Sequence, residues 1–329
     1  MRYLNSILEA IGQTPLIRLN RLAEGLKATI LVKAEFLNPG SSNKDRVGLR
    51  MILDAEAEGR LRPGGTIIES TSGNTGFGIA LVAAVKGYRC IFTLPDKVSR
   101  EKQNLLRALG AEIVVTPTDV DAEDPRSYYS VARRLAEEME NAIYINQYEN
   151  PSNPRAHYLT TGPEIWEQTE GRVDFLVAGM GTGGTICGAG RYLKERKPSL
   201  ELVGVDPVGS LYYDYWKEGK RVEPGRYLVE GIGEDFFPKT MDLSLIDRIY
   251  RTEDEESFLM ARRLARQEGI FTGGSGGAAV LGALRLAREI DEERVIVVVV
   301  PDTGERYLSK LYNDDWMRER GFLRKEGEE

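Results

Sequence analysis

Short runs of apolar, mostly β-branched residues alternate along the chain with stretches in which apolar residues recur at helical spacing. The short runs predict strands. These strands are expected at Thr29–Val32, Thr66–Glu69, Arg89–Phe92, Glu112–Val115, Phe175–Ala178, Leu202–Val205 and Val295–Val300. Strands that alternate with helices are typical of α/β proteins, so mostly parallel sheets with crossover helices are predicted.

The amphipathic stretches between these runs predict the connecting helices. They are expected at Val47–Gly59, Gly76–Val85, Arg100–Leu109, Tyr128–Glu138, Tyr158–Thr169 and Gly183–Arg196. At 329 residues the chain is too long for one average domain, so two α/β lobes are the expected organisation. Asn and Pro cluster between Gln147 and Pro154, which favours a lobe boundary there. The charged tail, Arg324 to Glu329, is expected to be disordered.

The composition then excludes several classes of protein. The net charge of −7 gives no basic footprint for a nucleic acid. The segment from Met1 to Pro15 carries Glu9 and Gln13 and lacks the basic and apolar regions of a secretory signal. The longest aliphatic run, Val295–Val300, is far shorter than the roughly 20 residues that span a bilayer. We therefore expect a cytoplasmic protein that binds neither nucleic acid nor membrane.

Metal chemistry is also not expected. Cys90 and Cys187 are the only cysteines and stand far apart, so they are expected to be buried, reduced thiols. His157 is the only histidine, and a histidine-based metal site needs more than one imidazole. Since no nucleophile-elbow motif is present, His157 is expected to be structural rather than part of a catalytic triad.

Candidate chemistry is concentrated in four loops, of which the first delivers Lys44. In the segment from Asn38 to Arg46, a Pro-Gly turn brings this lysine to the start of a predicted helix. The positive end of the helix dipole disfavours an ammonium group and would help to lower the pKa of Lys44, which suits Schiff-base chemistry. Taken alone, this position favours a solvated surface lysine, since most lysines are exposed.

The second loop, Ser70-Thr71-Ser72-Gly73-Asn74-Thr75-Gly76, follows the strand that ends at Glu69. Hydroxyl and backbone N–H groups that converge on a helix N-terminus form a nest for a carboxylate or another small anion. The alternative is a simple capping loop. Seven consecutive small polar or glycine residues exceed what a cap requires.

Two further loops are rich in glycine. The third, Gly179 to Thr185, lies between a predicted strand and a helix, as in a phosphate-binding loop. It also matches G-x-G-x-x-G, with Asp206 ending the next strand, so a dinucleotide site remains a rival interpretation. The fourth, Gly273 to Ala279, opens another helix and could be a plain connection.

Together, the four loops resemble those of fold type II pyridoxal-phosphate enzymes, in particular the branch that contains cystathionine β-synthase and cysteine synthase. The resemblance runs from Ile11-Gly12-Gln13-Thr14-Pro15-Leu16 to Gly321-Phe322-Leu323. It implies β-replacement, in which a thiol replaces the hydroxyl or ester group of serine or an O-activated serine. Two lobes, each an open and mostly parallel sheet flanked by helices, would hold pyridoxal 5′-phosphate in the cleft between them.

The resemblance also implies roles for individual residues. Lys44 would bind the cofactor covalently and act as the catalytic base, Asn74 would hydrogen-bond its 3′-oxygen, and Ser275 would face its pyridine nitrogen. The residues expected to bind the cofactor phosphate are Gly181, Thr182, Gly183, Gly184 and Thr185. Those expected to bind the substrate carboxylate are Thr71, Ser72, Gly73, Thr75 and Gln147.

The choice between the two activities depends on other segments. Val229 to Phe236 and the ending from Asn313 to Met317 are similar to cystathionine β-synthases, which favours condensation with homocysteine to give cystathionine. Asp302 to Tyr307 is nearer to cysteine synthases, so synthesis of cysteine from O-acetylserine or O-phosphoserine and sulfide is the alternative. A nucleotide-binding oxidoreductase using Gly179 to Gly184 would leave Lys44 and Ser275 unexplained.

Three residues of the first of these segments are expected near the substrate entrance, namely Glu230, Gly231 and Glu234. The two carboxylates would select a second substrate that carries an ammonium group. The alternative is that they are ordinary surface carboxylates in an acidic loop.

The family organisation predicts residues 1–12 and 37–149 as a smaller, mobile lobe and residues 13–36 and 150–329 as the larger lobe. The resemblance also implies a homodimer. Neither a haem-binding extension nor a tandem regulatory module is recognisable in the sequence, so neither haem nor regulation by S-adenosylmethionine is expected.

Overall fold

The computed structural model describes residues 1, 3–71, 73–96, 98, 100–120 and 123–324. It comprises two compact units. The first consists of Met1–Gln13 and Asn38–His157, and the second of Thr14–Leu37 and Tyr158–Glu329. The chain therefore enters the second unit early, leaves it, and returns. The first unit continues past the predicted boundary at residue 149 to His157.

The first unit contains a parallel four-stranded sheet in the order β5-β4-β3-β6. Its strands are β3 (Thr66–Ser70), β4 (Arg89–Pro95), β5 (Glu112–Thr116) and β6 (Ala142–Tyr144). Its helices are α1 (Lys44–Ala57), α2 (Asn74–Lys86), α3 (Arg100–Ala108), α4 (Tyr128–Glu138) and α5 (Ser152–Leu159), which extends two residues into the second unit. A short 3-10 helix, Ile7–Ala10, precedes them.

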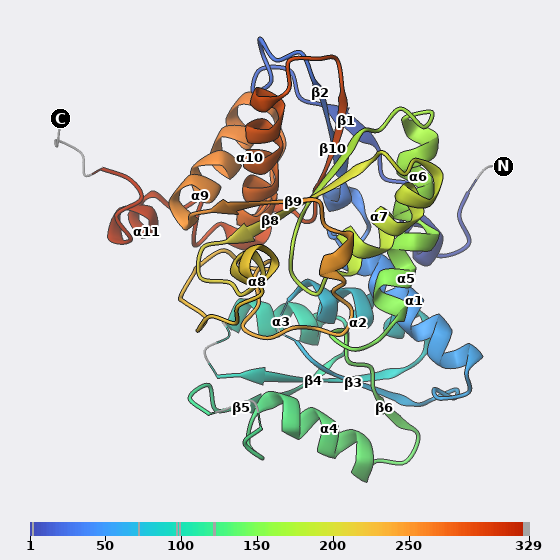
Figure 1. Cartoon of the computed structure of the whole chain (residues 1–329). Coiled ribbons are helices and arrows are strands. Elements are labelled where there is room, and N and C mark those ends of the chain that lie inside the picture. The colour runs from blue at the N-terminus through green and yellow to red at the C-terminus, as the bar shows by residue number, and fades with distance from the viewer. Residues whose placement is uncertain (2, 72, 97, 99, 121–122, 325–329) are drawn as a thin grey trace. The chain divides into compact units, whose positions relative to one another are not determined.

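Helices cover both faces of this sheet, as Figure 1 shows. Ile67 and Phe92 face the α1 and α2 side, where they pack with Val47 and Ile79. Ile68 faces the other side, toward α4. Since successive residues of a strand point to opposite faces and helices cover both, all five residues of β3 are buried, including the polar Thr66, Glu69 and Ser70.

The second unit contains a six-stranded sheet in the order β1-β2-β10-β7-β8-β9. Its strands are β1 (Leu16–Arg18), β2 (Thr29–Ala34), β7 (Phe175–Gly179), β8 (Glu201–Pro207), β9 (Arg248–Thr252) and β10 (Val295–Val300). Only β1 runs antiparallel to its neighbour. The seven strands predicted from the sequence correspond to β2, β3, β4, β5, β7, β8 and β10, whereas β1, β6 and β9 were not predicted.

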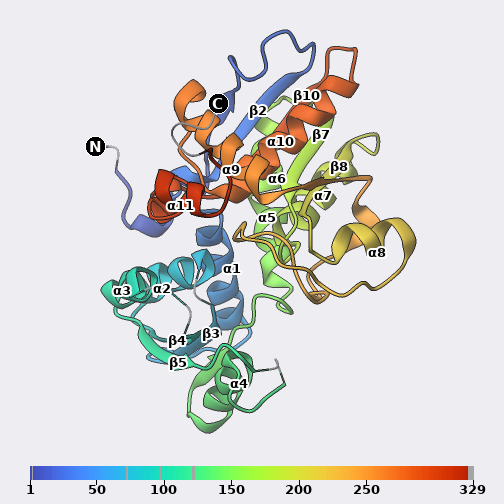
Figure 2. The same cartoon turned by 90° about the vertical axis from the view of Figure 1, so that its left-hand side faces the viewer.

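The helices of the second unit also lie on both faces of its sheet. They are α6 (Thr161–Gln168), α7 (Gly184–Arg196), α8 (Tyr212–Glu218), α9 (Asp254–Arg263), α10 (Gly274–Glu289) and α11 (Asp314–Glu319). Helices α9 and α10 lie side by side against one face (Figure 2). Helices α6 and α7 pack on the opposite face.

The predicted helix Tyr158–Thr169 is interrupted in the structure. Helix α5 ends at Leu159 and α6 begins at Thr161, while Thr160 has the non-helical angles φ −129° and ψ −66°. Pro163 lacks a backbone N–H and cannot continue a helix from the preceding turn, although it is tolerated in the first turn of a new one. The amphipathic pattern was therefore correct for α6, and the proline marks the start of a separate helix.

A buried lysine on β2 forms an ion pair with a glutamate on α6. Lys33 is 0% exposed, and its Nζ lies 2.6 Å from Glu164 Oε2 and 2.6 Å from the Thr14 carbonyl oxygen. Because a buried charge is costly unless it is paired and hydrogen-bonded, these contacts explain how a lysine is accommodated in the sheet.

Candidate active site

Lys44 is the first residue of α1 in the first unit. The turn before it is closed by a hydrogen bond of 2.7 Å from the Ser41 N–H to the Asn38 carbonyl, and Ser41 has a φ of +60°. The Gly40 N–H donates to the Asp45 carboxylate, and a Cβ on Gly40 would overlap that carboxylate. The Lys44 side chain is half-buried, with its Nζ 3.4 Å from Asn43 Oδ1. Turn and helix start together hold this amine in place.

Two glycines let α1 and α2 approach each other at the backbone. A Cβ on Gly48 would lie 2.6 Å from the Gly78 carbonyl carbon, and a Cβ on Gly78 would overlap the Lys44 carbonyl oxygen. Gly78 lies in the second turn of α2, close behind the loop that begins at Ser70. This contact brings the predicted catalytic lysine next to the start of the helix that follows the predicted carboxylate loop.

The loop before α2 is built from hydrogen-bonding groups. The Gly73 N–H lies 3.3 Å from Thr71 Oγ1, and Thr71 is buried. Thr75 donates its hydroxyl proton to Gln147 Oε1 at 2.6 Å, and both side chains are buried. The structure therefore brings Thr71, Gly73, Thr75 and Gln147 into one region, with Asn74 as the first residue of α2. Ser72 lies outside the described residues.

In the second unit, the loop from Gly179 to Gly184 joins β7 to α7. Gly183 caps α7 with a φ of +83°, which favours glycine. A Cβ on Gly183 would lie 2.7 Å from Met241 Cα, and one on Gly181 would lie 2.8 Å from the Gly231 carbonyl oxygen. These positions exclude side chains, so the loop presents backbone N–H groups at the start of a helix of 13 residues, followed by Thr185. Such an arrangement suits a phosphate.

Ser275 lies beside this loop. It is the second residue of α10 and is 2% exposed. A Cβ on Gly231, which has a φ of +87°, would lie 3.9 Å from Ser275 Oγ. Gly181, Gly231 and Ser275, which are far apart in the sequence, are thus neighbours in the second unit.

The two predicted entrance carboxylates have different surroundings. Glu230 forms an ion pair with Lys310 at 2.5 Å. Glu234 is half-buried, and its backbone N–H lies 3.2 Å from Ser210 Oγ. Burial and the Glu234 charge raise the pKa of Tyr227 and of Tyr212 above the usual range. The charge of Glu230 is therefore balanced by Lys310, whereas the charge of Glu234 helps to raise the pKa of two tyrosines.

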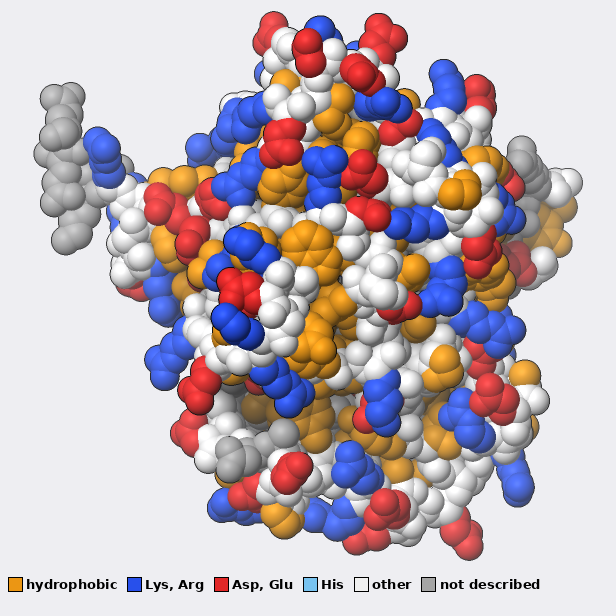
Figure 3. All heavy atoms as spheres, in the orientation of Figure 1, with side chains coloured by type: hydrophobic (Ala, Val, Ile, Leu, Met, Phe, Trp, Pro, Cys, Tyr) orange, Lys and Arg blue, Asp and Glu red, His pale blue; other side chains and the backbone are white. Residues whose placement is uncertain are grey.

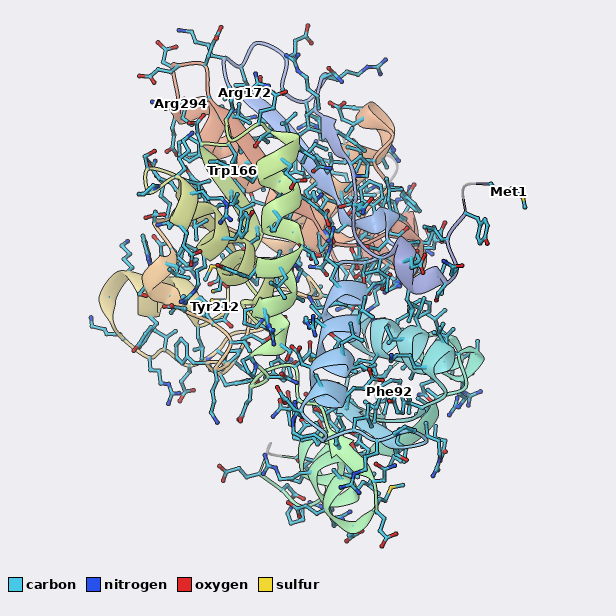
Figure 4. All side chains as sticks on the ribbon, turned by 90° about the vertical axis from the view of Figure 1, so that its right-hand side faces the viewer. Met1, Phe92, Trp166, Arg172, Tyr212 and Arg294 are labelled. Carbon is cyan, nitrogen blue, oxygen red and sulfur yellow. The ribbon has the colours of Figure 1, made fainter. Side chains whose placement is uncertain are left out.

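Tyr212 was not anticipated from the sequence. This residue, labelled in Figure 4, is 0% exposed. It donates its hydroxyl proton to the Gly181 carbonyl oxygen at 2.6 Å. This bond fixes the loop that the sequence analysis assigned to phosphate binding. Lys310 was also missed, because neither residue lies in a motif and both contacts join distant segments.

Asp206 argues against the nucleotide interpretation. This residue, which would have to bind a ribose, is 0% exposed and accepts a hydrogen bond of 3.0 Å from the Tyr213 N–H. Burial raises the pKa of Asp206 to about 7. Its Oδ2 is thus occupied by the protein's own backbone, and the group is buried.

Other sequence expectations concern metals, charge and membranes. His157 is 0% exposed, and both cysteines are buried, with burial raising the pKa of Cys90 to about 12. Among the residues that the structure describes, no group of three or more His, Cys, Asp or Glu side chains could hold a metal ion. No described helix is long and apolar enough to cross a membrane. On the face in Figure 3, basic and acidic side chains are interspersed.

Considered unit by unit, these features define an α/β enzyme with a lysine at a helix start and a glycine loop suited to a phosphate. The sequence matches the family described as "Pyridoxal-phosphate dependent enzyme" over residues 7–302. The chain belongs to this family.

Curated relatives cover nearly the whole chain. Cystathionine beta-synthase from Apis mellifera is 52% identical over 96% of this chain. The proteins of the same name from Oryctolagus cuniculus and Saccharomyces cerevisiae are 50% and 44% identical over 99% and 97% of it. The matches span 63%, 59% and 65% of the relatives' own lengths, so the chain corresponds to somewhat under two thirds of each.

A solved structure shares the fold. A hydrogen sulfide-producing enzyme from Fusobacterium nucleatum is 36% identical, with a TM-score of 0.86, and the match covers 93% of this chain and 98% of that one.

Proposed function

We propose that the chain binds pyridoxal 5′-phosphate covalently through Lys44 and holds its phosphate with the loop from Gly181 to Thr185. The fit is supported by the close backbone contacts of Gly181 and Gly183 at the start of α7 and by the buried position of Ser275. Asn74 and Ser275 would bind the 3′-oxygen and the pyridine nitrogen. When bound, the cofactor supplies an electron sink for the bond cleaved at the substrate Cα.

The protein's own residues then perform the remaining steps. Thr71, Ser72, Thr75 and Gln147 would bind the amino-acid carboxylate, with Gly73 at the start of the same helix. The free Lys44 amine would take the Cα proton as a general base and return a proton to the departing hydroxyl or ester. A hydroxyl at Ser275, unlike a carboxylate, would leave the pyridine nitrogen largely unprotonated, which favours β-elimination over transamination.

The reaction proposed is the condensation of serine, or an O-activated serine, with L-homocysteine to give L-cystathionine. The observation that carries it is the identity of 44–52% to cystathionine beta-synthases over at least 96% of the chain. The test is the visible spectrum of the purified protein, followed by L-serine and then homocysteine. A yellow protein whose band shifts with serine, recovers with homocysteine and yields cystathionine supports the proposal. A protein that stays colourless after incubation with the cofactor refutes it.

Chemistry involving sulfide is the second candidate. Sulfide chemistry is favoured by the structurally similar protein from Fusobacterium nucleatum, which is described as a hydrogen sulfide-producing enzyme. In this case O-acetylserine or O-phosphoserine would react with sulfide to give cysteine, or cysteine would release sulfide in the reverse sense. Faster recovery of the band with sulfide than with homocysteine would select it.

Replacing Glu234 tests the choice of thiol. We expect Glu234→Gln to lower the ratio of kcat/KM for homocysteine to that for sulfide about tenfold, because an ammonium loses a half-buried counter-charge worth on the order of 1.4 kcal/mol. Asp235→Asn, at an exposed neighbouring position, is the matched control. An unchanged ratio in Glu234→Gln would show that the carboxylate does not select the thiol.

Tyr212→Phe tests the phosphate loop. The substitution keeps the buried ring and removes the hydroxyl that donates to the Gly181 carbonyl. An unsatisfied buried carbonyl costs roughly 1–3 kcal/mol, so the dissociation constant for pyridoxal phosphate should rise about tenfold or more. Tyr213→Phe, in the same helix, should bind the cofactor as the unaltered protein does. Equal cofactor affinity in both variants would mean that the hydroxyl does not support the loop.

We also propose a homodimer and a mobile first unit, on the family resemblance alone. Light scattering of the purified protein checks the first, and hydrogen exchange with and without L-serine checks the second.

A further inference from the structure

Glu69 is a buried carboxyl group at the end of β3, directly before the carboxylate loop. It is 0% exposed, and its Oε2 has no hydrogen-bond partner among the described residues. In register it pairs with Phe92, whose side chain belongs to the cluster facing α1 and α2. Since paired residues of a parallel sheet share a face, the carboxyl group lies on the side where α1 and α2 pack.

The bonded oxygen of Glu69 holds a backbone turn. Its Oε1 accepts a hydrogen bond of 3.4 Å from the Gln147 N–H, and the Asn146 N–H also donates to the carboxyl group. Asn146 has a φ of +46°, in the left-handed region, which is uncommon for non-glycine residues although asparagine adopts it more readily than most. The turn ends in Gln147, whose side chain accepts from the Thr75 hydroxyl at 2.6 Å.

We propose that Glu69 is a positioning residue for the amino-acid substrate, acting through the Asn146–Gln147 backbone on the carboxylate site formed with Thr75. This inference rests on the proposed function, because Gln147 and Thr75 are assigned to the substrate carboxylate there. The carboxyl group itself does not contact substrate. It supports the backbone that carries the Gln147 side chain.

Ionisation of Glu69 should oppose substrate binding. Burial raises the pKa of Glu69 from 4.5 to about 8, so the group is neutral at pH 7 and becomes negative above pH 8. A buried negative charge behind the site would repel an incoming carboxylate.

Several titratable and charged groups lie on the elements around β3. They are Arg89 and Cys90 of β4, Tyr144 of β6, Tyr128, Tyr129, Arg133, Arg134, Glu137 and Glu138 of α4, Lys44, Asp45, Arg46, Arg50, Asp54 and Glu56 of α1, and Lys86 of α2. Burial raises the pKa of Cys90 to about 12, and burial together with the Glu69 charge raises the pKa of Tyr144 above its usual value. Both remain neutral between pH 7 and 9. Any effect of Lys44 ionisation on serine binding is the same in the unaltered protein and in its Glu69 variants, so it cancels when their dissociation constants are compared.

The experiment measures the dissociation constant of L-serine from the spectral shift of the holoenzyme at pH 7 and pH 9. Glu69→Ala leaves two buried N–H groups without an acceptor, and we expect serine to bind about tenfold more weakly at pH 7 while kcat at saturation stays within about threefold. Glu69→Gln keeps one acceptor and cannot ionise. At pH 7, Glu69→Gln should bind L-serine about as tightly as the unaltered protein does. At pH 9, the variant should bind L-serine about fivefold more tightly than the unaltered protein.

A second readout separates this effect from a general loss of structure. The unfolded chain releases the Glu69 proton near pH 4.5 and the folded chain near pH 8, so this group lowers stability progressively as pH rises between the two values. Glu69→Gln should lack this decline in thermal unfolding. Glu112→Gln, an exposed carboxylate on β5, is the matched control and should follow the unaltered protein in both measurements.

The outcomes distinguish this inference from the function on which it rests. If the unaltered protein shows no spectral response to L-serine at either pH, the proposed function fails and this inference fails with it. If that protein responds and both Glu69 variants follow it in affinity and pH profile, only the role of Glu69 is overturned. Should Glu69→Ala not fold, the pH profile of Glu69→Gln decides alone.

Discussion

Lys44→Ala should abolish the yellow colour of the holoenzyme and lower kcat at least about a thousandfold. The expected loss is large because one amine both attaches the cofactor and moves the Cα proton, and general acid–base catalysis alone contributes roughly 10²–10⁴-fold. Lys44→Arg keeps a positive charge at the start of α1 but cannot form the covalent bond, so it should lose the chromophore as well. Absorbance spectra and steady-state rates measure both effects.

The control for this experiment lies on the helix that packs against α1. Lys86, in the last turn of α2, forms a surface ion pair of 3.1 Å with Glu56, and such pairs contribute little to stability. Lys86→Ala should keep the chromophore and the rate. A Lys44→Ala protein that retained both would assign the covalent attachment to another lysine and invalidate the proposed chemistry.

Gly78→Ala should lower the free energy of unfolding of the first unit by about 1–3 kcal/mol or more. A methyl group there would overlap the Lys44 carbonyl oxygen, and both clashing partners are helix backbones that cannot rotate away. Relief requires α1 and α2 to separate, which would also displace Lys44. The expected signs are a lower midpoint of thermal unfolding and weaker binding of the cofactor.

Gly73→Ala provides the matched stability control, because it changes a glycine at the cap of the same helix. A Cβ at Gly73 would meet no atom within 4 Å, and its φ of −116° is ordinary for any residue. Its unfolding midpoint should stay close to that of the unaltered protein. If both glycine variants were equally stable, the close approach of α1 and α2 would not constrain the position of Lys44.

The fold could be predicted where one local pattern was sufficient. The β-branched runs of β2 and β10 occur where they were expected, because buried parallel strands are apolar on both faces. Strand β9, Arg-Ile-Tyr-Arg-Thr, was missed since it carries two arginines at the edge of its sheet. Strands β1 and β6 have three residues each, too few for a periodicity to show.

Part of the candidate site could likewise be predicted from local sequence patterns, and part could not. Its loops were recognisable because glycine and small polar residues are concentrated where a strand meets a helix, and the structure explains Gly181 and Gly183 by close backbone contacts. Tyr212 and Lys310 could not be inferred, since their roles depend on partners 31 and 80 residues away. Glu69 carried a usable signal that was not exploited: it is a charged residue that directly follows two isoleucines in a predicted strand, and the strand proves to be fully buried.

Because the chain enters the second unit early and returns to it late, the two sheets are completed at different times during synthesis. The sheet of the first unit is complete once β6 has emerged, whereas β2 must wait for its partner β10 near the other end of the chain. At about 5–20 residues per second, that delay is on the order of ten seconds. Throughout it, an apolar strand edge is available to other nascent chains. Lys33 places a charge in that strand before Glu164 pairs with it. Lys33 would therefore also protect the nascent protein from aggregation.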